Sequence, residues 1–314
     1  MPQPDLTVAP EPPAAAWKTW LAVGATGFGG PAGQVAILHR EVVERKQWLA
    51  EEEFLAALRL CMLLPGPEAQ QLATYAGWRT GGIRGGLVAG MLFVLPGAML
   101  VTALAWLHAA GRDVPCVAAA FAGVRPAVVA LVGLAAWRIG SRSITSPILA
   151  ALAIAAGVAL AYGVPFPAVV FICGVCGWIV PSARPAEPVP RSHVRRDLAR
   201  HAGAVVLVAG VTWIACYGLV WLTEAAGGRG PALATLFTET TLLSLGGAYA
   251  VVPWALDEAV ARGWLEASER FTALAMGEAT PGPLILVVTF IGFLAGWKAD
   301  PAPAAAAVGM LRAA

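Results

Sequence analysis

Residues 61–72 of the chain read Cys-Met-Leu-Leu-Pro-Gly-Pro-Glu-Ala-Gln-Gln-Leu, an apolar run that is broken at Pro65-Gly66-Pro67. The same tripeptide returns at Pro281-Gly282-Pro283, again between apolar residues. Proline interrupts a helix because it lacks an N–H donor, and a proline just after a break suits the first turn of a new helix. Each stretch therefore predicts a broken or re-entrant helix, and together they indicate an internal repeat.

The repeat extends well beyond these tripeptides. Its matches lie 217 residues apart before a one-residue gap and 216 residues apart after it. The further matched residues are Gly29-Gly30 with Gly246-Gly247, Glu41 with Glu258, Arg45 with Arg262, Trp48-Leu49 with Trp264-Leu265, Glu53 with Glu269, and Ala57-Leu58 with Ala273-Leu274. Chance likeness between Gly- and Pro-containing apolar segments would not keep such order, so the chain carries two copies of one structural unit.

The composition of the 314 residues identifies an integral membrane protein. Charged residues make up 13% of the chain, about half the share of roughly 25% in soluble domains. Hydrophobic residues make up 58%, and the mean hydropathy is +0.71. A net charge of +2 without a basic, aromatic-interleaved patch excludes a nucleic-acid partner. We expect an all-α, polytopic helical bundle in the lipid bilayer of the inner (plasma) membrane.

Apolar stretches between the two copies predict the topology. They are residues 85–107, 114–137, 147–162, 165–180 and 202–222. An odd number of spans inverts the second copy relative to the first. Inverted-topology repeats are typical of secondary transporters, whose substrate site lies near the bilayer midplane at broken helices. We therefore expect two inverted repeats that contain broken or re-entrant helices.

The arginines predict the orientation and the division of the chain. Five of them crowd the Pro-rich linker 181–200, which the positive-inside rule places in the cytoplasm. The amphipathic segment 40–59 falls on the same side and is expected to lie at the interface without spanning. The expected parts are a disordered tail at 1–16, the first repeat at 17–180, the basic linker at 181–200, a connecting helix and partial second repeat at 201–298, and an Ala/Pro-rich tail at 299–314.

Longer motifs accompany both breaks. In the first copy they are Phe28-Gly-Gly-Pro, His39-Arg-Glu-Val-Val-Glu, the stretch from Cys61 to Tyr75, and Arg84-Gly-Gly-Leu-Val-Ala-Gly-Met-Leu-Phe-Val-Leu-Pro-Gly. In the second copy they are Gly246-Gly-Ala-Tyr-Ala-Val-Val-Pro and Glu278-Ala-Thr-Pro-Gly-Pro-Leu. These motifs resemble the chromate ion transporter family. The resemblance implies export of chromate, a tetrahedral oxyanion, from the cytoplasm, driven by the proton gradient or the membrane potential.

The second copy departs from the pattern of two-domain members of that family, whose copies have about equal length. Residue 314 corresponds to about position 98 of the first copy, so we expect the second repeat to be incomplete. The expected protein partner is a second copy of the chain, in a homodimer, or a complementing half. The alternative is an inactive truncated scaffold that works only with such a partner half.

The implied substrate needs hydrogen-bond donors and positive potential away from bulk water. Helix N-termini supply both, through unpaired N–H groups and the macrodipole. Two interpretations of the breaks stay open, an anion cradle and plain helix-breaking hinges. The candidate substrate-binding backbone residues are Gly29, Gly30, Pro65, Gly66, Pro67, Gly246, Gly247, Pro281, Gly282 and Pro283.

Polar side chains near the breaks complete the candidate site. A carboxylate in an apolar stretch is costly, which suits Glu68 and Glu278 to proton coupling; complementing a helix N-terminus is the alternative for Glu68. The amides of Gln34, Gln70 and Gln71 either donate to the oxyanion or hydrogen-bond between helices.

Arg125 is a further candidate for substrate binding. It lies near the middle of the expected span 114–137, where its charge is costly unless Glu68, Glu278 or the dianion itself offsets it.

Enzymatic chemistry has little support in this sequence. The four histidines show no HExxH-type spacing, and Cys173 and Cys176 form a CxxC without a second pair. We therefore expect no catalytic residue, no metal and no cofactor. Sulfate or another oxyanion is the open alternative among substrates, because sulfate shares the charge and shape of chromate.

Overall fold

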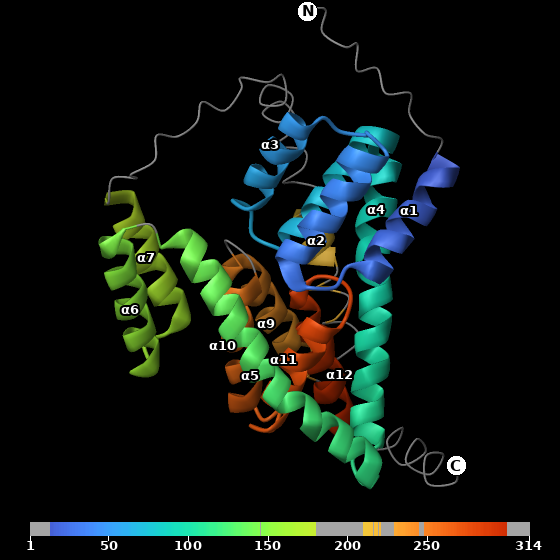
Figure 1. The fold of residues 1–314 in the computed structure, drawn as a ribbon. Coiled ribbons are helices and arrows are strands. Elements are labelled where there is room, and N and C mark those ends of the chain that lie inside the picture. The colour runs from blue at the N-terminus through green and yellow to red at the C-terminus, as the bar shows by residue number, and fades with distance from the viewer. Residues whose placement is uncertain are drawn as a thin grey trace, which may run out of the picture. The chain divides into compact units, whose positions relative to one another are not determined.

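The computed structural model describes residues 13–144, 146–179, 229–244 and 248–299, and parts of the segment 210–220. Within these ranges the regular elements are helices and none is a strand, which confirms the all-α prediction there (Figure 1). The elements are α1 (Pro13–Thr26), α2 (Gly30–His39), η1 (Arg40–Arg45), α3 (Glu51–Cys61), α4 (Glu68–Ala110), α5 (Pro115–Ser143), α6 (Pro147–Ala161), α7 (Phe166–Ile179), α9 (Gly230–Leu243), α10 (Ala248–Ala261), α11 (Glu269–Ala279), η2 (Leu284–Leu286) and α12 (Val287–Ala299).

The chain divides into two compact units. One unit combines Met1–Val132 with Phe237–Ala314, and the other is Gly133–Leu236. The first unit holds both Pro-Gly-Pro tripeptides. In the second unit, the two short apolar helices α6 and α7 pack against each other.

α4 consists of two helices that fold back on each other. At Gly81 and Gly82 the backbone leaves the helical region, with φ/ψ of −135°/17° and 63°/−156°. Gly77 before the bend and Gly85 after it lie close together. A Cβ added to Gly77 would be 2.5 Å from the Gly85 carbonyl oxygen. Two residues eight positions apart cannot meet in a straight helix. Residues 68–80 therefore run antiparallel to the start of residues 83–110.

Of the two parts of α4, only the second has the length of a membrane span. α4 is the one helix in the described part of the chain that is long and apolar enough to cross a membrane. Residues 83–110 extend roughly 40 Å at the α-helical rise, against about 30 Å of hydrocarbon. Residues 68–80 extend only about 20 Å and reach partway.

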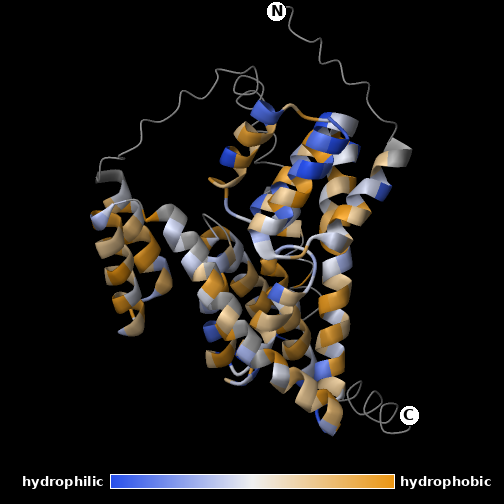
Figure 2. Ribbon diagram, viewed as in Figure 1, coloured by the Kyte–Doolittle hydropathy of each residue, from blue (hydrophilic) through white to orange (hydrophobic). Residues whose placement is uncertain are grey.

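Figure 2 shows how hydropathy follows the elements. Apolar residues run along the long part of α4 and along α6 and α7, whereas polar residues gather on η1 and at the start of α3. The expected spans 147–162 and 165–180 correspond to the short helices α6 and α7, and the expected span 202–222 lies largely outside the described residues.

α3 and residues 68–80 form an antiparallel pair, the first hairpin, with Pro65-Gly66-Pro67 at its tip. At the open end of the hairpin, opposite this tip, Glu53 near the start of α3 links the two helices. Its Oε1 accepts hydrogen bonds from the Tyr75 hydroxyl at 2.8 Å and from Arg79 Nε at 2.5 Å. The tip turns at Gly66, whose φ of 116° is readily adopted only by glycine.

α11, η2 and α12 form the second hairpin, with Pro281-Gly282-Pro283 at its tip. A glutamate again closes the open end, since Glu269 Oε2 accepts a hydrogen bond from Lys298 Nζ at 2.7 Å. Gly282 turns with a φ of 100°, close to that of Gly66. Glu53 and Glu269 are matched residues of the sequence repeat, so the same glutamate anchors both hairpins.

The helices come in the same order in the two copies of the repeat. α1, α2, α3 and α4 correspond to α9, α10, α11 and η2 with α12, and α1 and α9 have 14 residues each. The one-residue gap falls at the end of η1, a π-helical turn that continues α2. A π-helical turn holds one residue more than an α-helical turn. The extra residue of the first copy is therefore absorbed in η1, which has no equivalent in α10.

Backbone hydrogen bonds at this point show the shift directly. The N–H groups of Trp48 and Leu49 both donate to Val42 O, at 2.7 and 3.4 Å. Their matched residues Trp264 and Leu265 both donate to Ala259 O, at 2.9 and 3.2 Å. The same cap is thus kept around one additional residue.

Candidate functional site: the hairpin tips

The tip of the second hairpin is bonded to the first break of the first copy. Gly282 N–H donates to Gly27 O at 3.1 Å. Gly27 precedes Gly29 and Gly30, which have φ values of 91° and 67° and lead into α2. We refer to this contact between Gly27 and Gly282 as junction A.

Gln34 on α2 holds junction A together. Its side chain is buried, and Nε2 donates to Gly27 O at 3.3 Å and also to Gly282 O. Because both neighbours are carbonyl oxygens, the amide has to turn its NH₂ group toward them. Gln34 Oε1 is left buried without a hydrogen-bond partner among the described residues. The group left over at this site is therefore an acceptor.

The tip of the first hairpin makes the matching contact, junction B. Gly66 N–H donates to Ser244 Oγ at 2.9 Å, and Ser244 is buried directly after α9. Gln71 Nε2 donates to Pro65 O at 2.8 Å and stiffens the tip, while its Oε1 has no partner in the described chain. The NH₂ groups of Gln34 and Gln71, two of the three glutamines considered as donors to an oxyanion, are thus bonded to loop carbonyls.

Junctions A and B are equivalent under the repeat. At the offset of 217 Gly27 corresponds to Ser244, and at the offset of 216 Gly66 corresponds to Gly282. Each tip is therefore bonded to the break of the other copy. Reciprocal contacts of this kind are the pattern of a two-fold relation between two units.

The second tip lies beside the middle of the long part of α4. A Cβ added to Gly97 would collide with Pro281 O and would lie 2.7 Å from Leu286 Cδ1. Gly97 is about 20 Å along the helix from either end of residues 83–110. The tip is thus near half the depth of the helix that is long enough to cross a bilayer.

The start of α4 provides hydrogen-bond donors at the first tip. Pro67 is the N-cap, and the first bond into the helix runs from Gln71 N–H to Pro67 O. The N–H groups of Glu68, Ala69 and Gln70 come before it and have no helical partner, as at any helix start. Together with the helix dipole they give this tip a positive potential. The half-buried Glu68 lies in the same turn.

Glu278 approaches the start of α2 at junction A. Its Oε2 accepts a hydrogen bond from the Tyr249 hydroxyl at 3.4 Å and lies 3.8 Å from where a Cβ on Gly30 would be. Its Oε1 is buried without a partner among the described residues. The Tyr249 hydroxyl fills the space that a side chain on residue 30 would need, so the absence of a side chain at Gly30 admits both groups.

The structure brings most of the predicted site residues to these two junctions. Three others, Arg125, Gly246 and Gly247, lie wholly or in part outside the described structure. Arg125 lies on α5, but its side chain is outside the described structure, and Gly246 and Gly247 are outside the described residues. Two residues of the junctions, Ser244 and Tyr249, were not predicted from the sequence. Ser244 had a usable signal, because it is the repeat counterpart of Gly27 two residues before a glycine pair, whereas Tyr249 had none.

The open end of the second hairpin carries a dense polar network. Glu269, 2% exposed, accepts hydrogen bonds from Arg112 Nη2 at 3.0 Å and from the Glu266 N–H at 2.7 Å, besides that from Lys298. His108 Nε2 lies 3.5 Å from Glu269 Oε1. Burial by itself raises the pKa of Glu269, but His108, the Glu266 N–H and Lys298 outweigh it and lower the pKa to about 2. The carboxylate therefore stays charged and pins the hairpin.

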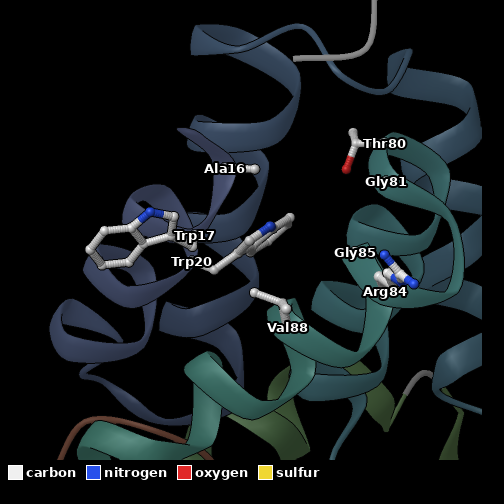
Figure 3. Close-up of a pocket in the computed structure, with 8 residues that line it drawn as sticks. All are labelled: Ala16, Trp17, Trp20, Thr80, Gly81, Arg84, Gly85 and Val88. Atoms are coloured by element: carbon white, nitrogen blue, oxygen red, sulfur yellow. The ribbon is translucent and has the colours of Figure 1, made fainter. Parts of the chain in front are cut away.

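Two cavities in the described chain lie away from the tips. One, of about 50 Å³, lies between α1 and the bend of α4, and Figure 3 shows Trp17, Trp20 and Val88 among the residues that line it. The other, of about 150 Å³, lies at the open end of the second hairpin beside His108 and Phe121. Each tip is hydrogen-bonded to the break of the other copy, through Gly27 or Ser244.

The chain matches a known family over most of its length. The family model described as "Chromate transporter" matches residues 14–178 and 231–311. The chain is similar to a chromate transport protein of Pseudomonas aeruginosa, with 32% identity over 280 residues, which cover 88% of this chain and 65% of that protein.

Two further relatives show the same extent of similarity. A probable chromate transport protein of Synechococcus elongatus is 29% identical over 295 residues, covering 88% of this chain and 67% of the relative. A chromate transport protein of Cupriavidus metallidurans is 27% identical over 297 residues, covering 92% and 69%. The chain thus spans about two thirds of the length of these relatives. No solved structure matches it.

Proposed function

Because the chain belongs to the chromate transporter family, we propose that it carries chromate across a membrane and binds it at the two hairpin tips. The observation that carries the proposal is the contact of Pro281 with Gly97, halfway along the membrane-length part of α4. Secondary transporters bind substrate where helices break near the midplane. A broken helix at that depth offers N–H donors and positive potential to an oxyanion.

The proposed cradle consists of backbone more than of side chains. At the first tip it is formed by Pro65, Gly66 and Pro67 with the N–H groups of the first turn of α4 and with Gly246 and Gly247, which follow Ser244 of junction B. At the second tip it is formed by Pro281, Gly282 and Pro283 with Gly29 and Gly30 of the neighbouring break. Gln34 and Gln71 hold these loops in place. Arg125 is the proposed cationic partner of the dianion.

We also propose that the two copies have inverted topology. The open end of the first hairpin, at Arg79, adjoins the bend that starts residues 83–110. The open end of the second hairpin, at Glu269, is bonded to Arg112, just past the end of the same helix. The two hairpins therefore approach the long part of α4 from opposite ends, which supports alternating access to a site between their tips.

The proposed direction is export from the cytoplasm, driven by the membrane potential or the proton gradient. A potential that is negative inside favours outward movement of an anion by about 2.3 kcal/mol per charge at 100 mV. Sulfate is the second candidate substrate. Backbone N–H donors recognise a tetrahedral dianion by its charge and shape, which sulfate shares with chromate.

Flux measurements on the full chain in vesicles test the proposal. Vesicles loaded with labelled chromate, or with labelled sulfate, should release the anion faster with the protein than without it, and faster still under an inside-negative potential. Gly282→Ala should stop the release, because φ is 100° there and a Cβ would press on Leu286.

Gly296→Ala is the matched control, because a Cβ on Gly296 has open space around it. This variant should transport like the wild type. The proposal is contradicted if neither anion is released, or if Gly282→Ala, inserted normally, releases it at the rate of the wild type.

A further inference from the structure

Glu278 presents its carboxylate to a helix start that is otherwise uncapped. The N-cap residue of α2 is Gly29, which has no side chain to accept a hydrogen bond from the first turn. Glu278 Oε2 lies 3.8 Å from the Cβ position of Gly30, the first residue of that turn. The N-terminus of a helix attracts anions. The carboxylate of Glu278 is thus placed where an anionic ligand of α2 would be bound.

No salt bridge offsets this carboxylate within the described residues. The Tyr249 hydroxyl is its one hydrogen-bond donor there, and Oε1 has none. The other titratable groups of the surrounding helices lie near the far ends of these helices and are engaged there. They are His39 and Arg40 at the end of α2, Asp257 and Glu258 late in α10, Glu269 and Arg270 at the start of α11, and Lys298 at the end of α12.

Gln34 provides an unused acceptor one helical turn beyond Gly30 on α2. The side chain is 1% exposed, and its Oε1 has no partner in the described chain because the NH₂ group is bonded to the two loops. A carboxylate cannot donate to this oxygen, but a protonated carboxyl can. One turn of helix is about 5.4 Å, a distance that a glutamate side chain covers by changing rotamer.

We propose that Glu278 is an internal anion that occupies the start of α2 and leaves it, protonated and bonded to Gln34 Oε1, when the substrate oxyanion binds there. Tyr249 is the positioning residue that holds the ionised form. This inference rests on the proposed function. One oxyanion then binds together with one proton taken from solution, so binding of the two is coupled through a single side chain.

Calorimetric titration of the purified full-length protein with chromate and with sulfate tests the coupling. Titrations in two buffers of different ionisation enthalpy count the protons taken up. The measurements belong in the alkaline range, where both anions are dianions in solution and any proton must bind to the protein. For the wild type we expect uptake of one proton, and an affinity that falls about tenfold per pH unit.

Three variants test whether Glu278 is the group that takes up the proton. Glu278→Gln should bind the oxyanion without proton uptake and with a flat pH profile. Tyr249→Phe should keep the uptake but move the fall in affinity to higher pH, because the ionised carboxylate loses its donor. Glu52→Gln, on the exposed start of α3, is the matched control and should behave as the wild type.

The outcomes distinguish this inference from the proposed function. If the wild type binds neither anion, the proposed function fails and the inference fails with it. If the wild type binds an anion without taking up a proton, or if Glu278→Gln retains the pH dependence, the inference alone is overturned. A Glu278→Gln protein that does not fold leaves the wild-type proton count and the Tyr249→Phe profile to decide.

Discussion

At Gly30 the backbone has a φ of 67°, and the Tyr249 hydroxyl lies where a side chain would begin. We expect Gly30→Ala to lose about 1–3 kcal/mol of stability, because an L residue is strained there and its Cβ displaces Tyr249. The measurement is the thermal midpoint of the purified protein in detergent. Gly81→Ala is the control, since Gly81 has a φ of −135° and open space around it. Equal midpoints for the two variants would contradict the argument.

The residues that break the helices could be predicted from the sequence, but the residues that join the breaks could not. Pro65 and Gly66 interrupt a helix through their own backbone chemistry, which is a local property. Gly27 and Ser244 act through bonds to distant tips, and a carbonyl or a hydroxyl carries no sign of its partner. The sequence likewise suggested Gln34 as a donor to substrate, because it could not show that two carbonyl groups already engage its NH₂ group.

At the scale of elements, Glu269 ties α11 to α12 and to the end of α4. Its pKa is about 2 in the folded protein, against an ordinary value of 4.5 for a glutamate. A carboxyl whose pKa is lower in the folded than in the unfolded protein stabilises the fold fully at pH values above its unfolded-state pKa. That stabilisation is lost as the pH falls toward 2. The shift corresponds to about 3 kcal/mol. We expect acid unfolding of the wild type to begin within this window.

The matched measurement is the pH dependence of the thermal midpoint of Glu269→Gln. This variant should be less stable than the wild type at neutral pH and should lack most of the further loss between about pH 4.5 and pH 2. Glu266→Gln, which keeps the Glu269 carboxylate in place, should retain that loss. An unchanged acid profile in Glu269→Gln would show that other groups dominate.

The π-helical turn η1 gives a prediction about chain length. Deletion of Lys46 should let α2 continue as an α-helix, as α10 does, with the cap of Trp48 on Val42 re-formed. We expect this deletion to cost far less stability than deletion of Ala57, which would rotate the buried face of α3 away from its partners. The two deletion variants can be compared by thermal midpoint and by yield in the membrane. A loss for the Lys46 deletion as large as that for Ala57 would refute the role assigned to η1.

The order of the elements was predictable from the repeat, because matched residues fold alike. The bend in α4 was not predicted as a helix-to-helix contact. The pair Gly81-Gly82 favours a bend through its own backbone freedom, but the sequence does not show that Gly77 then packs on Gly85. Close packing through small residues depends on the neighbouring helix, and hydropathy does not report it.

For the whole molecule, the proposed inverted topology predicts which residues share a side of the membrane. In a background without native cysteines, single cysteines at Arg45 and at its counterpart Arg262 should react with an impermeant reagent from opposite sides. A cysteine at Arg84, near the bend of α4, should react from the same side as Arg45. If the cysteines at positions 45 and 262 both react from the same side, the proposed inverted topology is wrong.

Both junctions join residues that the ribosome synthesises far apart in time. The hydrogen bond of Gly66 needs Ser244, which lies 178 residues further along the chain. The hydrogen bond of Gln34 to Gly282 needs a residue 248 positions further along. At about 5–20 residues per second, synthesis of the first of these two stretches takes roughly 10–40 s. During that time the Gly66 N–H has no protein partner, and such a group in hydrocarbon costs several kcal/mol. The nascent first hairpin therefore has to remain shallow, or keep water at its tip, until the ribosome delivers the second copy.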